Sequence, residues 1–322
     1  MNNILLIGAG QLGSRHLQAM ASTQHLLNIQ VVDPNEESLQ IAKLRFEEVS
    51  QNFKGEIAYL NSIDSVTDKV DIAIVASNSI VRRSIIQELL ARIEVANLVL
   101  EKFLFPKFED YDAVEKLLSD KKVTAWVNCP RRMMEGYTFL QEHISTPIRF
   151  NAYGKGWGMG SNGIHLLDIF AYITKENNIE LNNLKLSKTI IDSKRQGYIE
   201  FEGIISGSSN ANHFIVESRE GEPTPLKLEI DAGNKKFTIK EGVKAVMEIT
   251  NEDNDIIEQK EFDMPFQSQL TNIVIDEILS TGKCSLTPYE ESATLHKVYL
   301  NCLLSHLRIV KSDETIDECR IT

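Results

Sequence analysis

Residues 3–20 read NILLIGAGQLGSRHLQAM, and this stretch decides the fold of the first part of the chain. An apolar run ends at a glycine and is followed by apolar residues at helical spacing, which predicts a buried strand leading into a helix. Gly8, Gly10 and Gly13 form the pattern G-x-G-x-x-G at the junction. In such a turn the first glycine permits the tight bend, the second lets backbone approach a pyrophosphate, and the third lets the helix pack on the strand. The stretch therefore predicts a phosphate cradle at a helix N-terminus.

Two side chains in the first turns of this helix have two interpretations each. Arg15 either faces a bound nucleotide or is a solvated cation. His16 either faces the same nucleotide or is an imidazole packed in the core. The sequence alone leaves both alternatives open.

Strand and helix patterns alternate up to about residue 128. Apolar runs predict further strands at residues 28–33, 70–77, 97–102 and 122–128, with a weaker one at 56–60. Helical spacing predicts helices at residues 34–49, 80–92 and 108–120. Strands that alternate with helices form a parallel sheet covered on both faces. We therefore predict an α/β fold whose N-terminal part is a doubly wound, Rossmann-type parallel sheet.

Asp33 ends the second predicted strand and lies 33 − 13 = 20 residues after the last glycine of the turn. A carboxylate at this distance accepts hydrogen bonds from the adenine ribose hydroxyls, and its charge repels a 2′-phosphate. Pro34 and Asn35 follow, and neither is the arginine that would accept such a phosphate. NAD is therefore favoured as the cofactor over NADP. The alternative is a plain glycine turn in which Asp33 caps the next helix.

The ends of the predicted strands supply the remaining candidate cofactor contacts, because ligands of open α/β sheets lie at the carboxyl ends of the strands. Glu101 and Lys102 end the strand at 97–102. A lysine near a nicotinamide can bind a substrate hydroxyl or, with a lowered pKa, move its proton; the alternative is a solvated lysine. The predicted cofactor-binding residues are Gly8, Gly10, Gln11, Leu12, Gly13, Asp33, Ser77, Asn78, Glu101 and Lys102.

Residues 154–168, GKGWGMGSNGIHLLD, place five glycines in ten positions before an apolar helical run. Glycine loses more conformational freedom on folding than any other residue, so the cluster indicates unusual backbone angles or a close approach. Ser161 or Asn162 is expected to cap the helix. His165 and Asp168 are three residues apart and share a helix face. His165 either faces a ligand there or is a satisfied core histidine.

The remainder of the chain has a different pattern. Short segments from about residue 184 to 262 alternate apolar and polar residues, which is typical of an antiparallel sheet with one solvated face. Helical patterns at 269–280 and 289–307 close the chain. We predict two domains: a NAD-binding Rossmann domain over residues 1–122, and an α+β domain with a mostly antiparallel open sheet over residues 123–322. The second domain is expected to bind substrate and to form a homo-oligomer, a dimer or tetramer, through its sheet.

The composition excludes several classes of protein. The 322 residues include 34 Lys and Arg against 46 Asp and Glu, and the formal net charge of −12 disfavours nucleic acid and anionic membranes as partners. The four cysteines form no CxxC pair and no zinc pattern, so we expect reduced thiols, a cytoplasmic location and no metal site. No signal peptide is apparent, and no apolar run approaches the ~18 residues that a membrane span needs.

These motifs together resemble those of the glucose–fructose oxidoreductase/inositol 2-dehydrogenase (Gfo/Idh/MocA) oxidoreductase family. The glycine turn, Asp33 and the pair Glu101–Lys102 match the family's N-terminal pattern, with Phe103 where its common E-K-P has proline. The loop after the strand at 70–77 keeps the family's asparagine as Asn78. Val81 and Arg82 stand where that loop usually has a histidine.

The resemblance extends into the second half of the chain. Arg131 and Arg132 stand where the family often shows arginines before a helix. The segment SNGIHLLD is similar to the family's D-x-G-x-H-x-x-D, and Gly163, His165 and Asp168 are the matching residues. Ser161 occupies the position of the first aspartate.

The resemblance implies an NAD-dependent dehydrogenase that transfers a hydride to or from a hydroxyl carbon of a sugar, cyclitol or nucleotide-linked sugar, in sugar or polysaccharide metabolism. It implies Lys102 and His165 as the catalytic residues that handle the proton. The substrate-binding residues would be Lys102, Arg131, Trp157, Ser161, Asn162, His165 and Asp168. One alternative is a reductase of another carbonyl or imine. The other is a non-catalytic NAD(H)-binding regulator, because Ser161 lacks the basicity of the family's aspartate.

Overall fold

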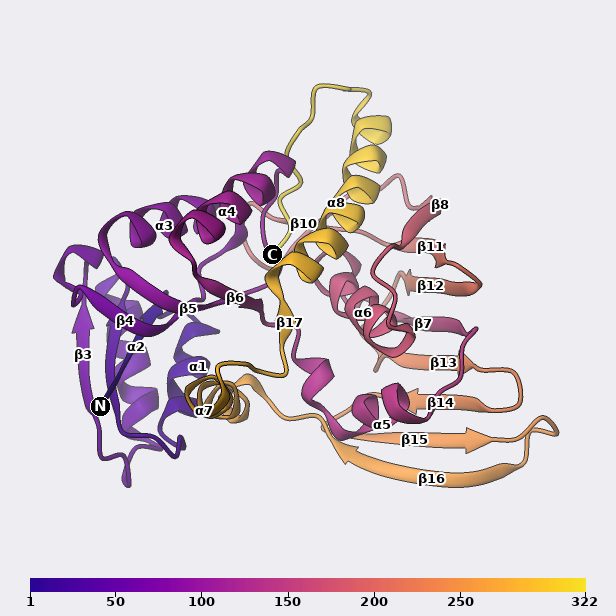
Figure 1. Cartoon of the computed structure of the whole chain (residues 1–322). Coiled ribbons are helices and arrows are strands. Elements are labelled where there is room, and N and C mark those ends of the chain that lie inside the picture. The colour runs from indigo at the N-terminus through magenta and orange to yellow at the C-terminus, as the bar shows by residue number, and fades with distance from the viewer. The chain divides into compact units, whose positions relative to one another are not determined.

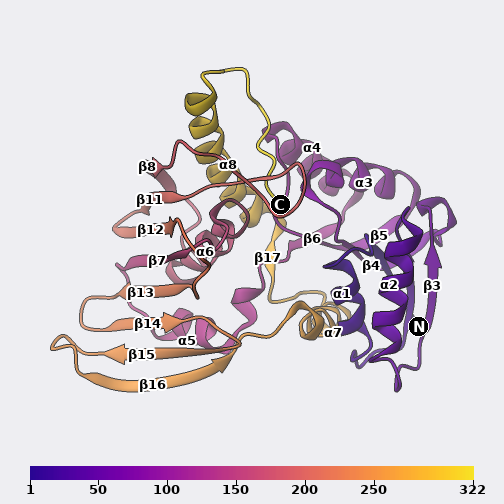
Figure 2. The same cartoon turned by 180° about the vertical axis from the view of Figure 1, so that it is seen from behind.

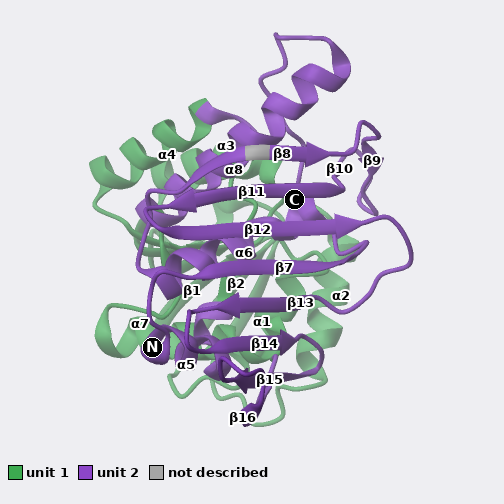
Figure 3. Ribbon diagram, turned by 90° about the vertical axis from the view of Figure 1, so that its right-hand side faces the viewer, with its two compact units in different colours: residues 1–105, 109–130, 265–289 green, residues 106–108, 131–264, 290–322 purple. Residues whose placement is uncertain are grey.

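The computed structural model describes residues 1–182 and 184–322 of the chain, in two compact units (Figure 3). Unit 1 comprises residues 1–105, 109–130 and 265–289, and unit 2 comprises residues 106–108, 131–264 and 290–322. Both units are therefore discontinuous, whereas the sequence analysis expected one boundary between residues 122 and 123. The reason is that residues 124–127 and 287–288 both add strands to the sheet of unit 1.

Unit 1 contains a seven-stranded sheet in the order β17-β6-β5-β4-β1-β2-β3. Its strands are β1 (Asn2–Ile7), β2 (Leu27–Val32), β3 (Glu56–Leu60), β4 (Lys69–Val75), β5 (Glu94–Leu100), β6 (Thr124–Val127) and β17 (Thr287–Pro288). Strands β1 to β6 pair in parallel, and β17 pairs antiparallel with β6. The order reverses direction between β1 and β4, and ligands of such sheets bind at this switch point.

Helices cover both faces of this sheet, as Figures 1 and 2 show. Helices α3 (Ser79–Arg92) and α4 (Phe108–Lys121) lie on one face, and α1 (Gly13–Met20), α2 (Glu36–Glu47) and α7 (Thr271–Thr281) lie on the other. Short 3₁₀ turns occupy Ile63–Ser65 and Gln267–Gln269. Because both faces are covered, β1 reads as a continuous apolar run, and Ile4, Leu5 and Leu6 are at most 1% exposed.

Unit 2 contains an eight-stranded sheet in the order β16-β15-β14-β13-β7-β12-β11-β8. Its strands are β7 (Arg149–Lys155), β8 (Glu180–Leu186), β11 (Gly203–Ser209), β12 (Asn212–Arg219), β13 (Lys227–Asp231), β14 (Lys236–Lys240), β15 (Lys244–Thr250) and β16 (Ile256–Asp263). Neighbours pair antiparallel except for β7 and β12, which are parallel. A separate two-stranded hairpin joins β9 (Ile191–Asp192) to β10 (Ile199–Glu200).

One face of the large sheet carries the helices of unit 2, while Figure 3 looks onto the opposite face, with the strands in front. These helices are α5 (Glu135–His143), α6 (Met159–Thr174) and α8 (Tyr289–Lys311), after a 3₁₀ turn at Pro130–Met133. Strand β12 shows the consequence, because Phe214 and Val216 are fully buried while Ile215 between them is 40% exposed. The α/β fold class with a Rossmann sheet and a mostly antiparallel second sheet is confirmed.

Some elements differ from the sequence-based expectations. Strand β7 and helix α5 were not predicted, β16 falls in the predicted antiparallel region without having been singled out, and α8 is four residues longer at its C-terminus than expected. Helix α6 begins at Met159, so neither Ser161 nor Asn162 is its N-cap; that position belongs to Gly158, at φ +73°. Over the described residues 1–182 and 184–322, no helix is long and apolar enough to cross a bilayer.

Candidate functional site

The glycine turn after β1 shows why each of its three glycines is present. Gly8 has φ +96°, a backbone conformation that side chains rarely adopt. A Cβ on Gly13 would lie 1.8 Å from the carbonyl oxygen of Gly8, so the contact between α1 and the turn requires glycine. A Cβ on Gly10 would meet nothing within 4 Å. The second glycine therefore faces open space, which is what a backbone approached by a pyrophosphate requires.

Asp33 follows β2 and is held against this turn. Its Oδ2 accepts the backbone N–H of Ala9 at 2.7 Å, and its Oδ1 accepts that of Asn35 at 2.8 Å. The N-cap of α2 is Asn35, whose side chain accepts the N–H of Ser38 at 3.0 Å, so the alternative in which Asp33 caps that helix is wrong. The carboxylate is thus fixed beside the glycine turn at the carboxyl end of its strand.

The start of α1 has the electrostatic character of an anion site. Leu12 stands at its N-cap, and no side chain among the described residues caps the helix there. Arg45 from α2 donates to Gln11 Oε1 at 2.8 Å and to Ser14 Oγ at 2.6 Å. A helix N-terminus and a guanidinium therefore lie together at the turn. The sequence analysis did not single out Arg45, because nothing in its local pattern distinguishes it from a solvated helix residue.

Ser77 and Asn78 follow β4, on the other side of the switch point. Asn78 Oδ1 accepts the N–H of Val81 at 3.3 Å and caps α3. Arg82, 1% exposed, donates to the backbone carbonyls of Ser77 and Phe103. This arginine, which stands where the resembling family has a histidine, therefore joins the loops that follow β4 and β5.

Glu101, after β5, belongs to a buried polar network. It is 3% exposed, and its Oε1 lies 2.8 Å from Nε2 of His16, which is itself 1% exposed. Asn128 donates to the same oxygen. His16 Nδ1 lies 2.8 Å from Thr271 Oγ1 of α7. His16 is thus a packed imidazole, and it ties the glycine-turn helix to the strand end that carries Lys102.

The charge of Glu101 follows from this network. Burial by itself raises the pKa of its carboxyl, but the hydrogen bond and charge of His16, with Asn128 and Lys102, outweigh burial and lower the pKa below its ordinary value. Glu101 is therefore a carboxylate at neutral pH. Lys102 is half-buried at the next position, and the peptide bond after it is cis. The predicted contacts of Glu101 and Lys102 with a cofactor remain predictions.

In unit 2, α6 carries His165 and Asp168, which are 8% and 1% exposed. Arg132 pairs with Asp168 through two hydrogen bonds, Nε to Oδ2 at 2.8 Å and Nη2 to Oδ1 at 2.9 Å, and also contacts Glu291. Burial lowers the pKa of Arg132, but Asp168 and Glu291 outweigh burial and raise it. The carboxylate of Asp168 is thus occupied by a buried bidentate pair. Its predicted role in substrate binding remains a prediction.

Arg131 has a comparable partner. Its Nε and Nη2 each donate to Glu241 at 2.8 Å, and the hydroxyl of Tyr137 donates to the same carboxylate. Burial raises the pKa of Glu241, but Arg131 more than offsets it, so the pKa lies below its ordinary value. Both partners are therefore charged, and the predicted use of Arg131 for substrate binding is untested.

The N-terminus of α6 is capped from a distant segment. Both carboxylate oxygens of Glu200 lie 3.3 Å from the backbone N of Ser161. Asn162 instead donates to the carbonyl of Trp157 at 2.8 Å, closing the turn before the helix. A Cβ on Gly163 would lie 2.0 Å from the hydroxyl of Tyr299 of α8, so close packing requires this glycine.

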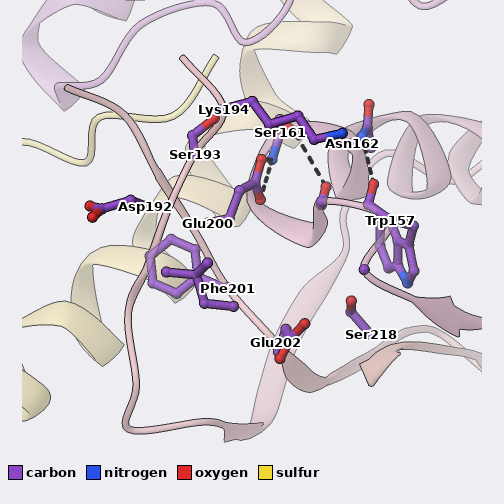
Figure 4. Close-up of a pocket in the computed structure, with 13 residues that line it drawn as sticks. Trp157, Ser161, Asn162, Asp192, Ser193, Lys194, Glu200, Phe201, Glu202 and Ser218 are labelled. Atoms are coloured by element: carbon purple, nitrogen blue, oxygen red, sulfur yellow. Dashed lines mark hydrogen bonds between the residues drawn. The ribbon is translucent and has the colours of Figure 1, made fainter. Parts of the chain in front are cut away.

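Three of the predicted substrate residues, Trp157, Ser161 and Asn162, line one pocket of about 320 Å³ in unit 2 (Figure 4). The sequence analysis missed the opposite wall, which comes from the β9–β10 hairpin and the residues that follow it. The added polar and aromatic lining residues are Asp192, Ser193, Lys194, Glu200, Phe201, Glu202 and Ser218. Over residues 1–182 and 184–322, no cluster of His, Cys, Asp and Glu is arranged to hold a metal ion.

A parallel sheet in the order 3-2-1-4-5-6, with a glycine turn after its first strand and a carboxylate after its second, defines a dinucleotide-binding α/β protein. Residues 2–129 match the family model described as Gfo/Idh/MocA, "Oxidoreductase family, NAD-binding Rossmann fold". The resemblance inferred from the sequence is thereby confirmed over residues 2–129, and NAD is the cofactor of the matching domain. No curated protein matches the chain in sequence.

Solved structures share the fold over nearly the whole chain. An oxidoreductase from Agrobacterium radiobacter, in complex with NAD⁺, L-tartaric acid and magnesium, is 14% identical with a TM-score of 0.69, covering 97% of this chain and 99% of that one. UDP-N-acetylglucosamine 3-dehydrogenase from Acidithiobacillus ferrooxidans is 12% identical with a TM-score of 0.70, covering 93% and 96%. A super-repressor mutant of Gal80p from Saccharomyces cerevisiae is 15% identical with a TM-score of 0.70, covering 95% and 96%.

Proposed function

We propose that this protein is an NAD-dependent dehydrogenase that transfers a hydride to or from a hydroxyl carbon of a sugar, a cyclitol or a nucleotide-linked sugar. The observation that supports it most is the glycine turn, where Gly10 faces open space and Asp33 is fixed beside the turn. The matched family model, an NAD-binding oxidoreductase domain, supports the general activity. The choice of a hydroxyl-bearing carbohydrate is supported by similar folds such as UDP-N-acetylglucosamine 3-dehydrogenase.

The residues of unit 1 fit a bound dinucleotide. The backbone at Gly10 and the uncapped N-terminus of α1 would hold the pyrophosphate, with Arg45 adding positive charge. Asp33 would accept the adenine ribose hydroxyls, and its charge disfavours the 2′-phosphate of NADP. When bound, the nicotinamide ring supplies the hydride acceptor or donor.

The chain's own residues handle the proton in this proposal. Lys102 Nζ and the imidazole of His165 are the proposed catalytic groups: one exchanges the proton of the substrate hydroxyl and the other polarises its oxygen. The buried pair of Glu101 and His16 fixes the backbone that carries Lys102, so both are proposed as positioning residues. The proposed substrate contacts are Lys102, Arg131, Trp157, Ser161, Asn162, His165 and Asp168.

The open face of the second sheet supports a homo-oligomer. Ile215 of β12 is 40% exposed on the face opposite to the helices, and Ile256 of β16 is 61% exposed. Exposed apolar side chains on a broad sheet face are typical of subunit interfaces. We propose a dimer or tetramer through this face, which light scattering coupled to size exclusion tests. An Ile215→Lys variant should dissociate it.

A second candidate function is a non-catalytic NAD(H)-binding regulator. Two observations favour it: Ser161 replaces a basic aspartate, and the carboxylate of Asp168 is already paired with Arg132. A super-repressor mutant of Gal80p has a similar fold, which is consistent with a regulatory role. A reductase of another carbonyl or imine is the remaining alternative.

The test is to follow the near-ultraviolet absorbance of NADH while the protein and NAD are mixed with a panel of sugars, cyclitols and sugar nucleotides. The dehydrogenase proposal expects NADH to form with at least one of them, and this formation to be lost in Lys102→Met. NAD binding without turnover across the panel favours the regulator. Turnover of NADH with ketones or imines alone favours the other reductase.

A further inference from the structure

The pocket in unit 2 has an acidic lining that limits what it can bind. Three carboxylates, Asp192, Glu200 and Glu202, and one ammonium, Lys194, line it, a formal charge of −3 + 1 = −2. In Figure 4 Glu200 and Lys194 reach toward Ser161 and Asn162 of α6, Glu202 lies nearer Ser218, and the carboxylate of Asp192 points away from Trp157. A phosphate or carboxylate entering this space would be repelled. The lining therefore favours a ligand with hydrogen-bond donors and positive charge.

Ser218 gives an independent indication that a ligand belongs there. It lies on β12 and is 1% exposed, and its Oγ is buried with no hydrogen-bond partner among the described residues. The same residue lines the pocket (Figure 4). A buried hydroxyl without a partner is costly, and hydroxyls of native proteins are normally satisfied. A ligand with a polar group at this depth would satisfy it.

Trp157 supplies the apolar part of the pocket. Its indole N–H donates to the backbone carbonyl of Glu217 at 2.9 Å, so the ring is fixed and its polar atom is already used. What the ring offers to the pocket is aromatic surface. Aromatic surface beside carboxylates suits a compact ring that has C–H faces and polar edges, as a sugar has.

Glu202 is the lining carboxylate whose charged form a positively charged ligand would stabilise most. It is half-buried, and both burial and the nearby charge of Glu220 raise the pKa of its carboxyl. Glu200 differs, because its two oxygens already cap α6 at Ser161. A cation beside Glu202 would favour its charged form and would gain a charge-assisted hydrogen bond.

We propose that this pocket binds the protonated amino group of an amino sugar, with Glu202 as its anionic partner and Trp157 against the sugar ring. The inference rests on the proposed function, because Trp157, Ser161 and Asn162, three of the proposed substrate contacts of that dehydrogenase, line this pocket. It excludes sugar phosphates and sugar acids as ligands of this pocket.

Calorimetric titration of the full-length protein saturated with NAD tests this. The probes are glucosamine, glucose, N-acetylglucosamine and glucosamine 6-phosphate. Glucosamine should bind at least about tenfold more tightly than the other three, because it alone pairs an ammonium with the carboxylates and carries no phosphate. This preference should vanish when the pH exceeds the pKa of the amine. Equal affinity for glucose and glucosamine at neutral pH overturns the proposal.

Matched variants locate the preference in the pocket. Glu202→Gln should reduce the preference for glucosamine over glucose several-fold, because the carboxylate that pairs with the amine is gone. Glu252→Gln, an exposed glutamate in the turn after β15, is the control and should leave the preference unchanged. A preference that survives Glu202→Gln contradicts the proposal.

Measuring NADH formation in the same samples separates this inference from the proposed function. If neutral sugars are turned over without any preference for an amine, the dehydrogenase proposal is supported and the amino-sugar proposal is contradicted. Selective binding of glucosamine without NADH formation from any substrate supports the pocket and counts against the dehydrogenase.

Discussion

Two glycine-rich turns, one in each unit, owe their glycines to different causes. In the turn after β1, Gly8 has φ +96° and Gly13 touches the carbonyl of Gly8, so the main reasons lie within six residues of sequence, although a Cβ on Gly8 would also meet Ala76 and Ser77 at 3.1 Å. Gly10 is the exception, since a side chain there would meet nothing. That turn is shaped locally and leaves one backbone position open for a ligand.

In the turn before α6, Gly156 and Gly158 also have positive φ, +51° and +73°, but two other glycines have distant causes. A Cβ on Gly160 would meet Glu200 at 2.8 Å, and one on Gly163 would meet Tyr299 at 2.0 Å. Both partners come from other parts of unit 2. The cluster of glycines that suggested close approach to a ligand is thus explained largely by packing against the protein itself. A motif with fixed spacing between a strand and a helix is therefore stronger evidence of a ligand than glycine content alone.

The sharpest test of this comparison is Gly13→Ala. The added methyl group would overlap the carbonyl oxygen of Gly8, so the free energy of unfolding should fall by about 3 kcal/mol. Urea denaturation measures it. Gly10→Ala is the matched control, and its stability should stay within about 0.5 kcal/mol of wild type. Wild-type stability of Gly13→Ala would show that the contact between turn and helix is not required.

Lys102→Met tests whether unit 1 contributes a catalytic group besides the cofactor turn. Turnover should fall about a hundredfold or more, because the ammonium proposed to exchange the proton is gone. The affinity for NAD should stay the same, since the glycine turn and Asp33 are untouched. Steady-state rates and a binding titration measure the two effects. Unchanged turnover removes Lys102 from the mechanism.

Gly163→Ala is the counterpart in unit 2. The methyl group would overlap Tyr299, and we expect the free energy of unfolding to fall by about 2 kcal/mol, since the α6 and α8 helices must separate slightly. The folded variant should still bind NAD with wild-type affinity. A loss of NAD affinity at unchanged stability would mean that this glycine serves the cofactor after all.

His16→Gln tests how much the buried network of unit 1 contributes to stability. An exposed histidine of unit 2 serves as its control. The folded-state pKa of Glu101 lies below its ordinary value of 4.5, so the pair stabilises the fold above that pH and loses this contribution as the pH falls through the folded-state value. Without His16 the pKa of Glu101 rises and the free energy of unfolding should fall by about 1–2 kcal/mol, so acid unfolding should begin at a higher pH. Circular dichroism during acid titration measures the midpoint.

The control for that experiment is His143→Gln, an exposed histidine at the end of α5 that bonds only its own helix carbonyl. Its acid midpoint should equal that of wild type. Equal midpoints for all three proteins would mean that the contact between His16 and Glu101 adds nothing to stability.

The sequence was sufficient to predict the alternation of strands and helices up to residue 127, because the apolar residues of each element there recur with the spacing of a strand or of a helix. It was insufficient for β7, and it did not single out β16 within the predicted antiparallel region. In β7 the buried positions include the small residues Ala152 and Gly154, and β16 is an edge strand whose residues are mostly exposed, so neither shows a clear apolar period.

The candidate site could also be predicted from the sequence only in part. The cofactor turn and Asp33 carry a spacing that local physics requires, and the structure holds them together. Trp157, Ser161 and Asn162 were found from their glycine-rich context. Glu202 and Ser218 could not be found, because their place in the pocket depends on the pairing of the hairpin and the sheet, which no local pattern records.

The most direct test of the central claim is a calorimetric titration of the wild-type protein with NAD and, separately, with NADP. If the turn after β1 cradles a dinucleotide and Asp33 holds its adenine ribose, NAD binds at one site per chain and NADP binds at least about tenfold more weakly. Absence of NAD binding, or a preference for NADP, would contradict the account.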